Sequence, residues 1–406
     1  MKILLVDDES FALRLLTHQL SKLGFSDIVS MQSPTEALAL LEADVRVADM
    51  VLLDLQMPDI DGIEFVRHLS RLGYTGGLVL VSGEDERILQ TARRLAEAHR
   101  LDVRGALHKP VTPNALSLLL GPASTQGHAR TPISARPVAS GATYAPARIR
   151  EGIEAGEFFN VYQPKVRLAD GEITGVETLV RWNHPEDGVV APVHFIDVAE
   201  EHGLIDPLTR VVLANALRQM REWRLAGREL HTAVNISMES LSALDFPDFV
   251  ADAVRQVGIP AHLLVLEVTE SRLMKNPLAV LDVLTRIRLK HIGLSIDDFG
   301  TGHSSLAQLR DIPFDELKVD RQFVHRAHLD SASRTILDAS LGIARQLGMR
   351  SVAEGVEAQE EWDLLRSLGC DVAQGYFIAK PMVPAAFMTW CGEWEARRNA
   401  MRPSVA

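Results

Sequence analysis

Short apolar runs that end at a polar residue recur through the first 120 residues. The first extends from Lys2 to Val6, and later ones end at positions 53 and 81. Between them, the apolar spacing predicts helices over residues 11–23 and 35–41, with Pro34 at the start of the second. Buried strands that alternate with helices are typical of a doubly wound parallel sheet, so we expect an α/β fold in this part of the chain.

The polar residues that follow these runs carry candidate chemistry. Because the carboxyl ends of parallel strands meet at one edge of a sheet, these residues should share one pocket. They are Asp7, Asp8, Asp54, Ser82 and, after a fifth short run, Lys109. Clustered carboxylates favour Mg²⁺, an aspartate beside that ion can take up a phosphoryl group, and a lysine and a hydroxyl can hold the phosphate oxygens. Any one of these residues alone would be explained as well by a solvated strand end.

The same residues lie in motifs that resemble those of response-regulator receiver domains. LLVDDE, LLDLQMPDIDG, VSG and HKP occur in the order typical of that family. The resemblance implies a flavodoxin-like fold with a bound Mg²⁺. It also implies Asp54 as phosphoacceptor, Asp7 and Asp8 as metal-binding acids, and Ser82 and Lys109 as phosphate contacts.

One position departs from the receiver pattern. The family usually places an aromatic residue, which rotates as a switch, shortly before the lysine, whereas this chain has Ala106. We still expect phosphorylation of Asp54 by a cognate histidine kinase or another phosphodonor. The aromatic switch that usually transmits this phosphorylation in the family is missing from this chain.

The composition changes between residues 121 and 146. This stretch is rich in Pro, Ala, Ser, Gly and Thr, has no acidic residue and shows no sustained apolar period. Such a composition is typical of a semi-extended linker. We therefore predict a domain over residues 1–120, a flexible linker over 121–146, a second domain over 147–397 and a disordered tail over 398–406.

Apolar runs that lead to polar residues return on a larger scale after this linker. They alternate with amphipathic stretches of helical length, such as residues 208–225 and 331–347. Repeated βα units over about 250 residues predict a TIM-like (β/α) barrel. In such barrels the active site lies at the carboxyl ends of the strands.

The polar residues of the predicted barrel form an oxygen-rich set. Those expected to lie together are Glu177, Asn235, Glu267, Asp297 and, immediately adjacent, Asp298. The set contains no thiolate or histidine, which favours Mg²⁺ or Mn²⁺ over zinc. If Asp297 bridges two ions, Asp298 can reach the second. Two ions suit in-line attack of water on a phosphodiester.

Three further residues extend this predicted site. Lys318 can stabilise phosphate charge or orient the water, and Arg181 can hold a phosphate through two hydrogen bonds. Glu354 is either a general base or a further metal ligand, and the sequence leaves both roles open. The glycines that follow Asp298 permit a loop that moves or approaches the substrate closely.

Seven motifs of this region resemble those of EAL domains, a phosphodiesterase family that linearises cyclic di-GMP to pGpG. YQPKVRLADGEITGVETLVRWNHPEDG, NIS, LEVTE, DDFGTG, LKVD, AEGVE and QGYF occur in the family's order within residues 147–397. The resemblance implies the metal-binding, catalytic and phosphate-binding roles described above. It adds loop positioning by Glu270, a substrate or water contact by Gln374, and substrate contacts by Gln163 and Asp320.

Two positions depart from the EAL pattern. The triplet that names the family contains Thr178 in place of the usual alanine, from which we expect a modest packing effect. His303 stands in the glycine-rich loop where an aromatic residue is common. A histidine there could make the loop sensitive to pH, although an exposed histidine without a role is the simpler interpretation.

Charge and composition narrow the classes of function. A formal net charge of −12 and the lack of a basic recognition helix in the sequence argue against a DNA-binding regulator. No apolar run approaches the roughly 18 residues that a membrane span needs, so we expect a cytoplasmic protein without membrane insertion. Cys370 and Cys391 lie outside any metal-binding spacing and are expected to be small buried hydrophobic residues.

The complete acidic set favours an enzyme. We expect a two-component response regulator that hydrolyses cyclic di-GMP to linear pGpG and is regulated by phosphorylation of Asp54. The alternative is a signalling module that binds cyclic di-GMP with little turnover and acts through protein contacts. Because both families commonly associate, we also expect a homodimer or a higher oligomer.

Overall fold

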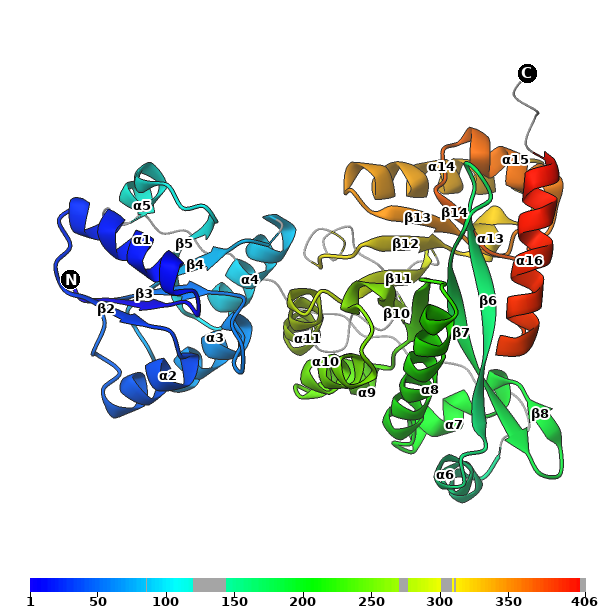
Figure 1. Cartoon of the computed structure of the whole chain (residues 1–406), viewed down its shortest axis with the longest axis horizontal. Coiled ribbons are helices and arrows are strands. Elements are labelled where there is room, and N and C mark those ends of the chain that lie inside the picture. The colour runs from blue at the N-terminus through cyan, green and yellow to red at the C-terminus, as the bar shows by residue number, and fades with distance from the viewer. Residues whose placement is uncertain (85, 120–143, 270–276, 301–308, 310–311, 402–406) are drawn as a thin grey trace. The chain divides into compact units, whose positions relative to one another are not determined.

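The computed structural model describes residues 1–84, 86–119, 144–269, 277–300, 309 and 312–401 (Figure 1). The chain divides into two compact units. The larger unit is built around a closed barrel and the smaller one around an open parallel sheet. The predicted linker falls almost entirely outside the described residues.

Eight strands close the barrel. In spatial order they are β6 (Phe158–Arg167), β14 (Val372–Ala373), β13 (Arg350–Ala353), β12 (Glu316–Val319), β11 (Gly293–Phe299), β10 (Leu264–Thr269), β9 (His231–Asn235) and β7 (Ile173–His184). Strand β6 is antiparallel to both of its neighbours, and its pairing with β7 completes the closure. The other neighbouring pairs are parallel, and the short β8 (Gly188–Val190) forms a hairpin with β7. The TIM-like barrel predicted from the sequence is confirmed.

Helices and short helical turns connect the barrel strands, except that α6 precedes the first strand and α16 follows the last. The bounds of the α-helices are α6 (Pro146–Glu154), α7 (Ile196–Glu201), α8 (Ile205–Leu225), α9 (Met238–Ser242), α10 (Phe246–Val257), α11 (Pro277–Leu289), α13 (Arg321–Val324), α14 (Ser331–Gln346), α15 (Gln359–Ser367) and α16 (Pro384–Met401). Two 3₁₀ turns, η1 (Pro192–His194) and η2 (Ala261–Leu263), complete the connections. The predicted boundary at residue 397 lies inside α16, so the first four residues of the predicted tail are helical. Among the described residues, no helix combines the length and apolarity that a membrane span requires.

Local sequence explains where these helices begin and end. The Asp330 carboxylate accepts hydrogen bonds from the backbone N–H groups of Ala332 and Ser333 and so caps the start of α14. Helix α10 ends at Val257 and is capped by Gly258, whose φ of 73° is readily adopted only by glycine. The predicted helices 208–225 and 331–347 agree with α8 and α14 to within a few residues.

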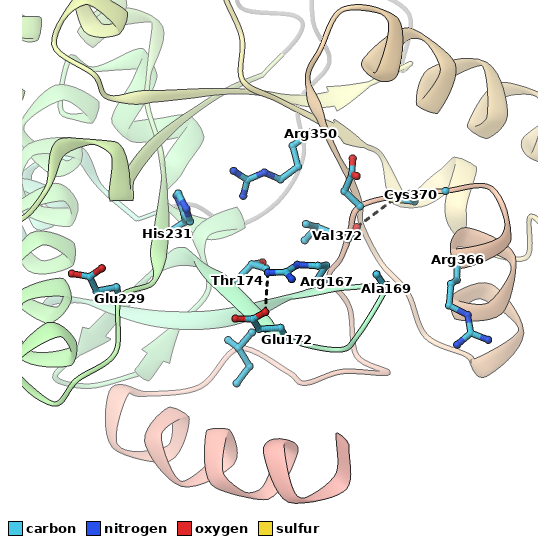
Figure 2. A pocket seen from close by; sticks show the side chains of 13 residues that line it. Arg167, Ala169, Glu172, Thr174, Glu229, His231, Arg350, Arg366, Cys370 and Val372 are labelled. Carbon is cyan, nitrogen blue, oxygen red and sulfur yellow. Dashed lines mark hydrogen bonds and ion pairs between the residues drawn. The ribbon is translucent and has the colours of Figure 1, made fainter. Parts of the chain in front are cut away.

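A cavity of about 690 Å³ opens at the amino ends of the barrel strands (Figure 2). Its lining includes His231 and Arg350, which are the first residues of β9 and β13. Arg167 also lines it and forms an ion pair of 2.9 Å with Glu172. This end of the barrel is opposite to the carboxyl ends at which the candidate ligands were expected.

The smaller unit is a five-stranded parallel sheet in the order β2-β1-β3-β4-β5, as expected for a flavodoxin-like fold. Its strands are β1 (Ile3–Val6), β2 (Ile28–Met31), β3 (Met50–Asp54), β4 (Gly77–Ser82) and β5 (Asp102–His108). Its helices are α1 (Ser10–Lys22), α2 (Pro34–Ala43), α3 (Gly62–Arg71), α4 (Glu86–Ala98) and α5 (Pro113–Leu119).

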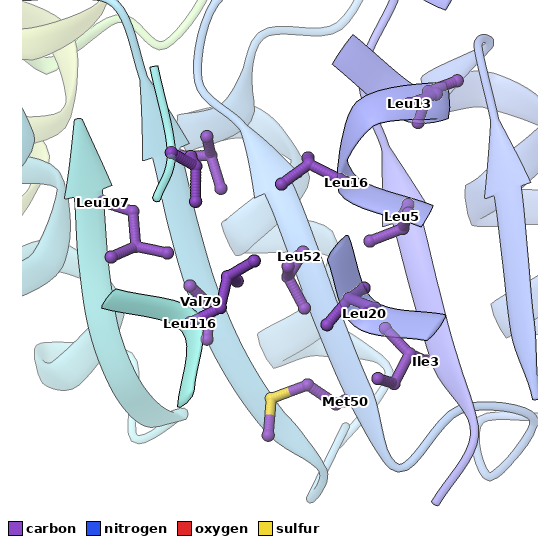
Figure 3. Packing of buried hydrophobic residues seen from close by; sticks show 12 residues of the cluster. Ile3, Leu5, Leu13, Leu16, Leu20, Met50, Leu52, Val79, Leu107 and Leu116 are labelled. Atoms are coloured by element: carbon purple, nitrogen blue, oxygen red, sulfur yellow. The ribbon is translucent and has the colours of Figure 1, made fainter. Parts of the chain in front are cut away.

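An aliphatic core holds this sheet together. Helix α1 directs Leu13, Leu16 and Leu20 toward one face of the sheet, and Figure 3 shows them facing Leu5 and Leu52. All five side chains are buried, because burial removes their apolar surface from water. The core leaves the polar residues at the strand ends free to form a pocket.

Candidate active site

Strand register brings the candidate ligands to the carboxyl end of the barrel. Glu267 on β10 pairs with Asn235 on β9, and Asp297 on β11 pairs with Thr269 on β10. Glu177 lies on β7, the next strand around the barrel. Side chains at every second position of a strand share a face, and these candidate ligands share the interior face.

The carboxylates form two overlapping clusters. Glu177, Glu267 and Asp297 each place one oxygen within 4.8 Å of the others. Asp297, Asp298 and Glu354 form a second group by the same measure. Asp297 belongs to both clusters, as a residue that bridges two cations must.

Lys318 lies at the centre of these acids. Its Nζ is 3.1 Å from Glu267 Oε2, 3.1 Å from Asp297 Oδ1 and 2.5 Å from Glu354 Oε1. A longer contact of 3.8 Å reaches Glu177. The lysine side chain is fully buried, and burial lowers the pKa of an ammonium. Here the surrounding carboxylates outweigh burial and raise the pKa of Lys318 well above its ordinary value.

Three amides surround the carboxylates. The Nδ2 of Asn235 lies 3.1 Å from Glu177 Oε1 and 3.4 Å from Glu267 Oε2. Gln374 donates through Nε2 to Glu177 and to Gln163. These contacts bring Gln163 and Gln374, two predicted substrate contacts, to the edge of the acidic clusters.

Burial and mutual repulsion raise the pKa values of two of these acids. Burial raises the pKa of Glu354 to about 8, with further contributions from Asp297 and Glu177, while Lys318 opposes the shift. The pKa of Asp298 rises to about 6 through burial and the nearby charges of Asp297 and Asp320. A bound cation would relieve this repulsion, and the donors are the oxygen ligands that Mg²⁺ and Mn²⁺ prefer. The residues therefore fit such a metal.

Glu267 behaves differently from the other acids. Burial alone would raise its pKa, but Lys165 and Lys318 outweigh burial and hold the pKa at about 2. Lys165 is a residue that the sequence analysis missed. A lysine inside the apolar strand sequence FFNVYQPKV was the available signal, because a buried ammonium needs an acidic partner.

The remaining predicted residues lie around this centre or outside the described part of the chain. Asp320 caps α13 by accepting from the Gln322 N–H at 2.8 Å. Arg181 is half-buried on β7 and donates to the carbonyl of Val180 at 2.8 Å. Glu270 and His303 lie outside the described residues, so their predicted roles in the loop remain predictions.

The backbone is unusual where the acids meet the glycine-rich loop. Asp298 has φ of 57°, a left-handed conformation that is uncommon for a residue other than glycine. Gly300 has φ of 100°, and a Cβ there would meet the ring of Phe323 at 2.7 Å. Asp298 lies at an irregularity in the register of β11 with β12, and its carboxylate groups with those of Asp297 and Glu354.

The smaller unit brings its own predicted residues together. Lys109 Nζ lies 2.9 Å from Asp7 Oδ2 and 3.0 Å from Asp54 Oδ2. Asp7, Asp8 and Asp54 form a third group whose oxygens lie within 4.8 Å of one another. Burial raises the pKa of Asp54 to about 6, although Lys109 opposes the shift. This pocket also fits a divalent cation.

Two other predicted positions of this unit occupy its neighbouring strands. Ser82 is buried at the end of β4, and its Oγ accepts from the Glu84 N–H at 3.1 Å. Ala106 lies on β5 opposite Leu80 and has no side chain beyond Cβ to rotate. The five predicted pocket residues therefore lie at the carboxyl ends of the strands or directly after them, as the doubly wound sheet requires.

Comparison with known proteins identifies both units. The EAL domain model matches residues 147–381, and the response regulator receiver domain model matches residues 3–120. The cyclic di-GMP phosphodiesterase RocR of Pseudomonas aeruginosa is 33% identical over 391 residues, which cover 96% of this chain and 98% of RocR. The cyclic di-GMP phosphodiesterase PdeR of Escherichia coli is 32% identical over 84% of this chain and 55% of its own length.

Solved structures agree with these relationships. A structure described as the PaMucR phosphodiesterase in complex with c-di-GMP is 38% identical, with a TM-score of 0.57 over 59% of this chain and 98% of that one. The EAL enzyme Bd1971, solved with cAMP and cyclic di-GMP bound, is 32% identical with a TM-score of 0.58, over 60% of this chain and 67% of that one. The chain therefore belongs to the EAL domain family and carries a response regulator receiver domain ahead of its EAL domain.

Proposed function

We propose that this chain is a metal-dependent cyclic di-GMP phosphodiesterase that releases linear pGpG and is regulated through its receiver domain. The observation that carries the proposal is the position of Asp297, which belongs to both acidic clusters of the barrel. Relatives named as cyclic di-GMP phosphodiesterases support the substrate, and RocR does so over nearly the whole chain.

The acidic clusters are the proposed holders of two Mg²⁺ or Mn²⁺ ions. Glu177, Asn235, Glu267 and Asp297 would hold one ion, and Asp297 with Asp298 would hold the other. When bound, such ions supply Lewis acidity and lower the pKa of a water molecule.

The surrounding residues act on the substrate and the water. Lys318 stabilises negative charge that develops on the phosphate. Glu354 lies beside Lys318 and belongs to the second cluster, which suits it either as the general base or as a metal ligand.

Substrate contacts are proposed for the rim of this site. Arg181 would bind a phosphate, while Gln163, Gln374 and Asp320 would contact the nucleotide or the attacking water. Glu270 would position the glycine-rich loop. Of these residues, Gln374 has the most direct support, because it already donates a hydrogen bond to Glu177.

In the receiver domain, Asp54 is the proposed phosphoacceptor. Asp7 and Asp8 would hold a Mg²⁺ ion, and Ser82 and Lys109 would contact the phosphoryl oxygens. Lys109 already lies 3.0 Å from Asp54. A histidine kinase or a small-molecule phosphodonor would supply the phosphoryl group, and the signal would pass without an aromatic switch at Ala106. A cytoplasmic location and a homodimer or a higher oligomer are part of the same proposal.

Chromatographic detection of pGpG tests the barrel activity directly. Purified full-length chain is incubated with cyclic di-GMP and Mg²⁺ or Mn²⁺, and we expect pGpG from the wild type but none from Glu177→Ala. Glu172→Ala is a matched control, because Glu172 lies on the turn before the same strand and is exposed. Saturable binding of cyclic di-GMP without product under either metal would instead favour a binding module.

A further inference from the structure

We propose that Lys165 is a positioning residue that holds one carboxylate oxygen of Glu267 and thereby directs the other toward the candidate metal site. The inference rests on the proposed function, because that function makes Glu267 a metal ligand. It assigns a role to a residue outside the catalytic and ligand set described above.

The place of Lys165 on β6 puts its side chain inside the barrel. It is two positions from Gln163, so the two side chains share the interior face. Gln163 pairs with Glu177 on the neighbouring strand β7. Lys165 pairs with Gly175 on the same strand, and this glycine contributes no side chain. A Cβ at Gly175 would meet the His231 carbonyl oxygen at only 2.3 Å. Lys165 therefore occupies the layer directly beneath the candidate ligands, opposite a position that cannot carry a side chain.

The two oxygens of Glu267 have separate partners. Oε1 lies 2.7 Å from the Nζ of Lys165. Oε2 lies 3.1 Å from the Nζ of Lys318 and 3.4 Å from the Nδ2 of Asn235. Because the carboxylate is fully buried, each oxygen depends on these partners rather than on water. Lys165 therefore fixes which oxygen faces the acidic clusters.

A polar layer supports the lysine from below. Lys165 Nζ also lies 3.1 Å from Glu316 Oε1, and that oxygen accepts a hydrogen bond of 3.1 Å from Ser295 Oγ. Barrel interiors are usually filled by branched aliphatic side chains, which carry no desolvation cost of this kind. Here a buried lysine lies between two carboxylates instead, and one of these carboxylates belongs to a candidate ligand.

Adjacent strands repeat this two-layer arrangement. Ser295 and Asp297 are two positions apart on β11, and Glu316 and Lys318 are two positions apart on β12. Each strand thus gives one residue to the candidate metal layer and one to the supporting layer. Partners that orient metal ligands in this way typically change metal affinity or activity by about 10–100-fold when they are removed.

Metal binding by full-length variants tests the proposal. Lys165→Met keeps an unbranched side chain that is one atom shorter, but removes its charge and its hydrogen-bond donors. Free Mn²⁺ is measured by its paramagnetic resonance signal during titration, and Glu177→Ala marks the part of the isotherm that belongs to the barrel. We expect Lys165→Met to weaken that part by about 10–100-fold, with a smaller change in KM for cyclic di-GMP at saturating metal.

Two variants separate positioning from a general effect of substitution. Lys165→Arg keeps a positive charge and donors, so it should recover a large part of the Mn²⁺ affinity. Lys22→Met, which alters an exposed lysine of the receiver domain, should leave the isotherm unchanged. If Lys165→Met does not fold, as judged by circular dichroism, Lys165→Gln retains one donor group and carries the test with the same expected direction.

The outcomes are distinct. A folded Lys165→Met or Lys165→Gln protein that binds Mn²⁺ as tightly as the wild type would overturn the positioning role and leave the proposed phosphodiesterase intact. A wild-type barrel that binds no Mn²⁺ and yields no pGpG would overturn the proposed function and this inference together.

Discussion

The Nζ of Lys318 lies 2.5 Å from the Oε1 of Glu354, and the lysine is fully buried whereas the side chain of Glu354 is 20% exposed. The lysine is the nearest positive charge to an acid whose pKa is otherwise raised by burial. The pair therefore links the proposed phosphate-stabilising group to the proposed base. Replacing either partner should therefore change the pKa of the other.

Lys318→Met should lower kcat for cyclic di-GMP hydrolysis by at least about 100-fold. The variant loses a fixed positive charge that would stabilise the negative charge developing on the phosphate in the transition state. Steady-state production of pGpG gives kcat, and equilibrium dialysis of cyclic di-GMP shows whether binding is kept. Lys380→Met, at an exposed lysine, is the control. A kcat within threefold of the wild type would remove Lys318 from the catalytic set.

Asp297→Asn and Asp298→Asn should differ in metal stoichiometry. Asp297 belongs to both acidic clusters, whereas Asp298 belongs to one. We expect Asp298→Asn to lose the weaker barrel ion and Asp297→Asn to weaken both. Mn²⁺ titration of the two variants under identical conditions measures this difference, and equal stoichiometries would argue against a bridging Asp297.

Most of this site could be predicted from the sequence, for a physical reason. Parallel strands place their carboxyl ends together, so a polar residue directly after an apolar run already has a known place in the fold. That reasoning located Asp54 in the receiver and Asp297 in the barrel. It did not locate Lys165. A lysine in an apolar strand signals the need for an acidic partner, but no local pattern identifies Glu267 and Glu316, which this lysine meets across the barrel.

The helix boundaries show the same limit on a smaller scale. Asp330 and Gly258 are local cap signals, and α14 and α10 obey them. The end of α16 was placed too early, since the helix runs to Met401 beyond the predicted boundary and the stop signal in the sequence is Pro403.

The stability of the receiver domain should depend on pH through ionisation of the Asp54 carboxyl group. Its folded-state pKa of about 6 exceeds the ordinary value of 3.8 because the carboxylate is buried. The folded state therefore holds this proton more tightly than the unfolded state, and the resulting stability is full below pH 4 and lost as pH rises through 6. Asp54→Asn does not ionise, so its advantage over the wild type should grow with pH.

Urea unfolding of the receiver transition in Mg²⁺-free buffer measures this effect. Between pH 5 and pH 8 the difference in unfolding free energy between Asp54→Asn and the wild type should grow by about 1 kcal/mol. Added Mg²⁺ should stabilise the wild type more than the variant, because it binds the ionised carboxylate. If the difference stays constant with pH, ionisation of the buried Asp54 carboxylate does not destabilise the folded receiver domain.

Thr178→Ala should be nearly silent for catalysis. Thr178 alternates with Glu177 along β7, so its side chain points to the opposite face of the strand. It is buried, and within the described residues its hydroxyl has no hydrogen-bond partner. The cost of that buried hydroxyl and the packing lost with the methyl group oppose each other, so stability should change by no more than about 1 kcal/mol. Thermal unfolding and kcat/KM check both expectations, and a tenfold change in kcat/KM would contradict them.

Strand β6 runs in the direction opposite to its neighbours in the barrel. This reversal changes which residue of the strand, the earlier or the later one, lies nearer the candidate site. On β11 and β12 a later residue lies nearer the mouth, whereas on β6 the earlier Gln163 lies nearer the mouth and the later Lys165 lies deeper. A slip of two residues along β6 would exchange an amide for an ammonium beside Glu177. A neutral hydrogen-bonding group at the rim would then be replaced by a second ammonium beside that of Lys318, and this added charge would compete with the cations for Glu177.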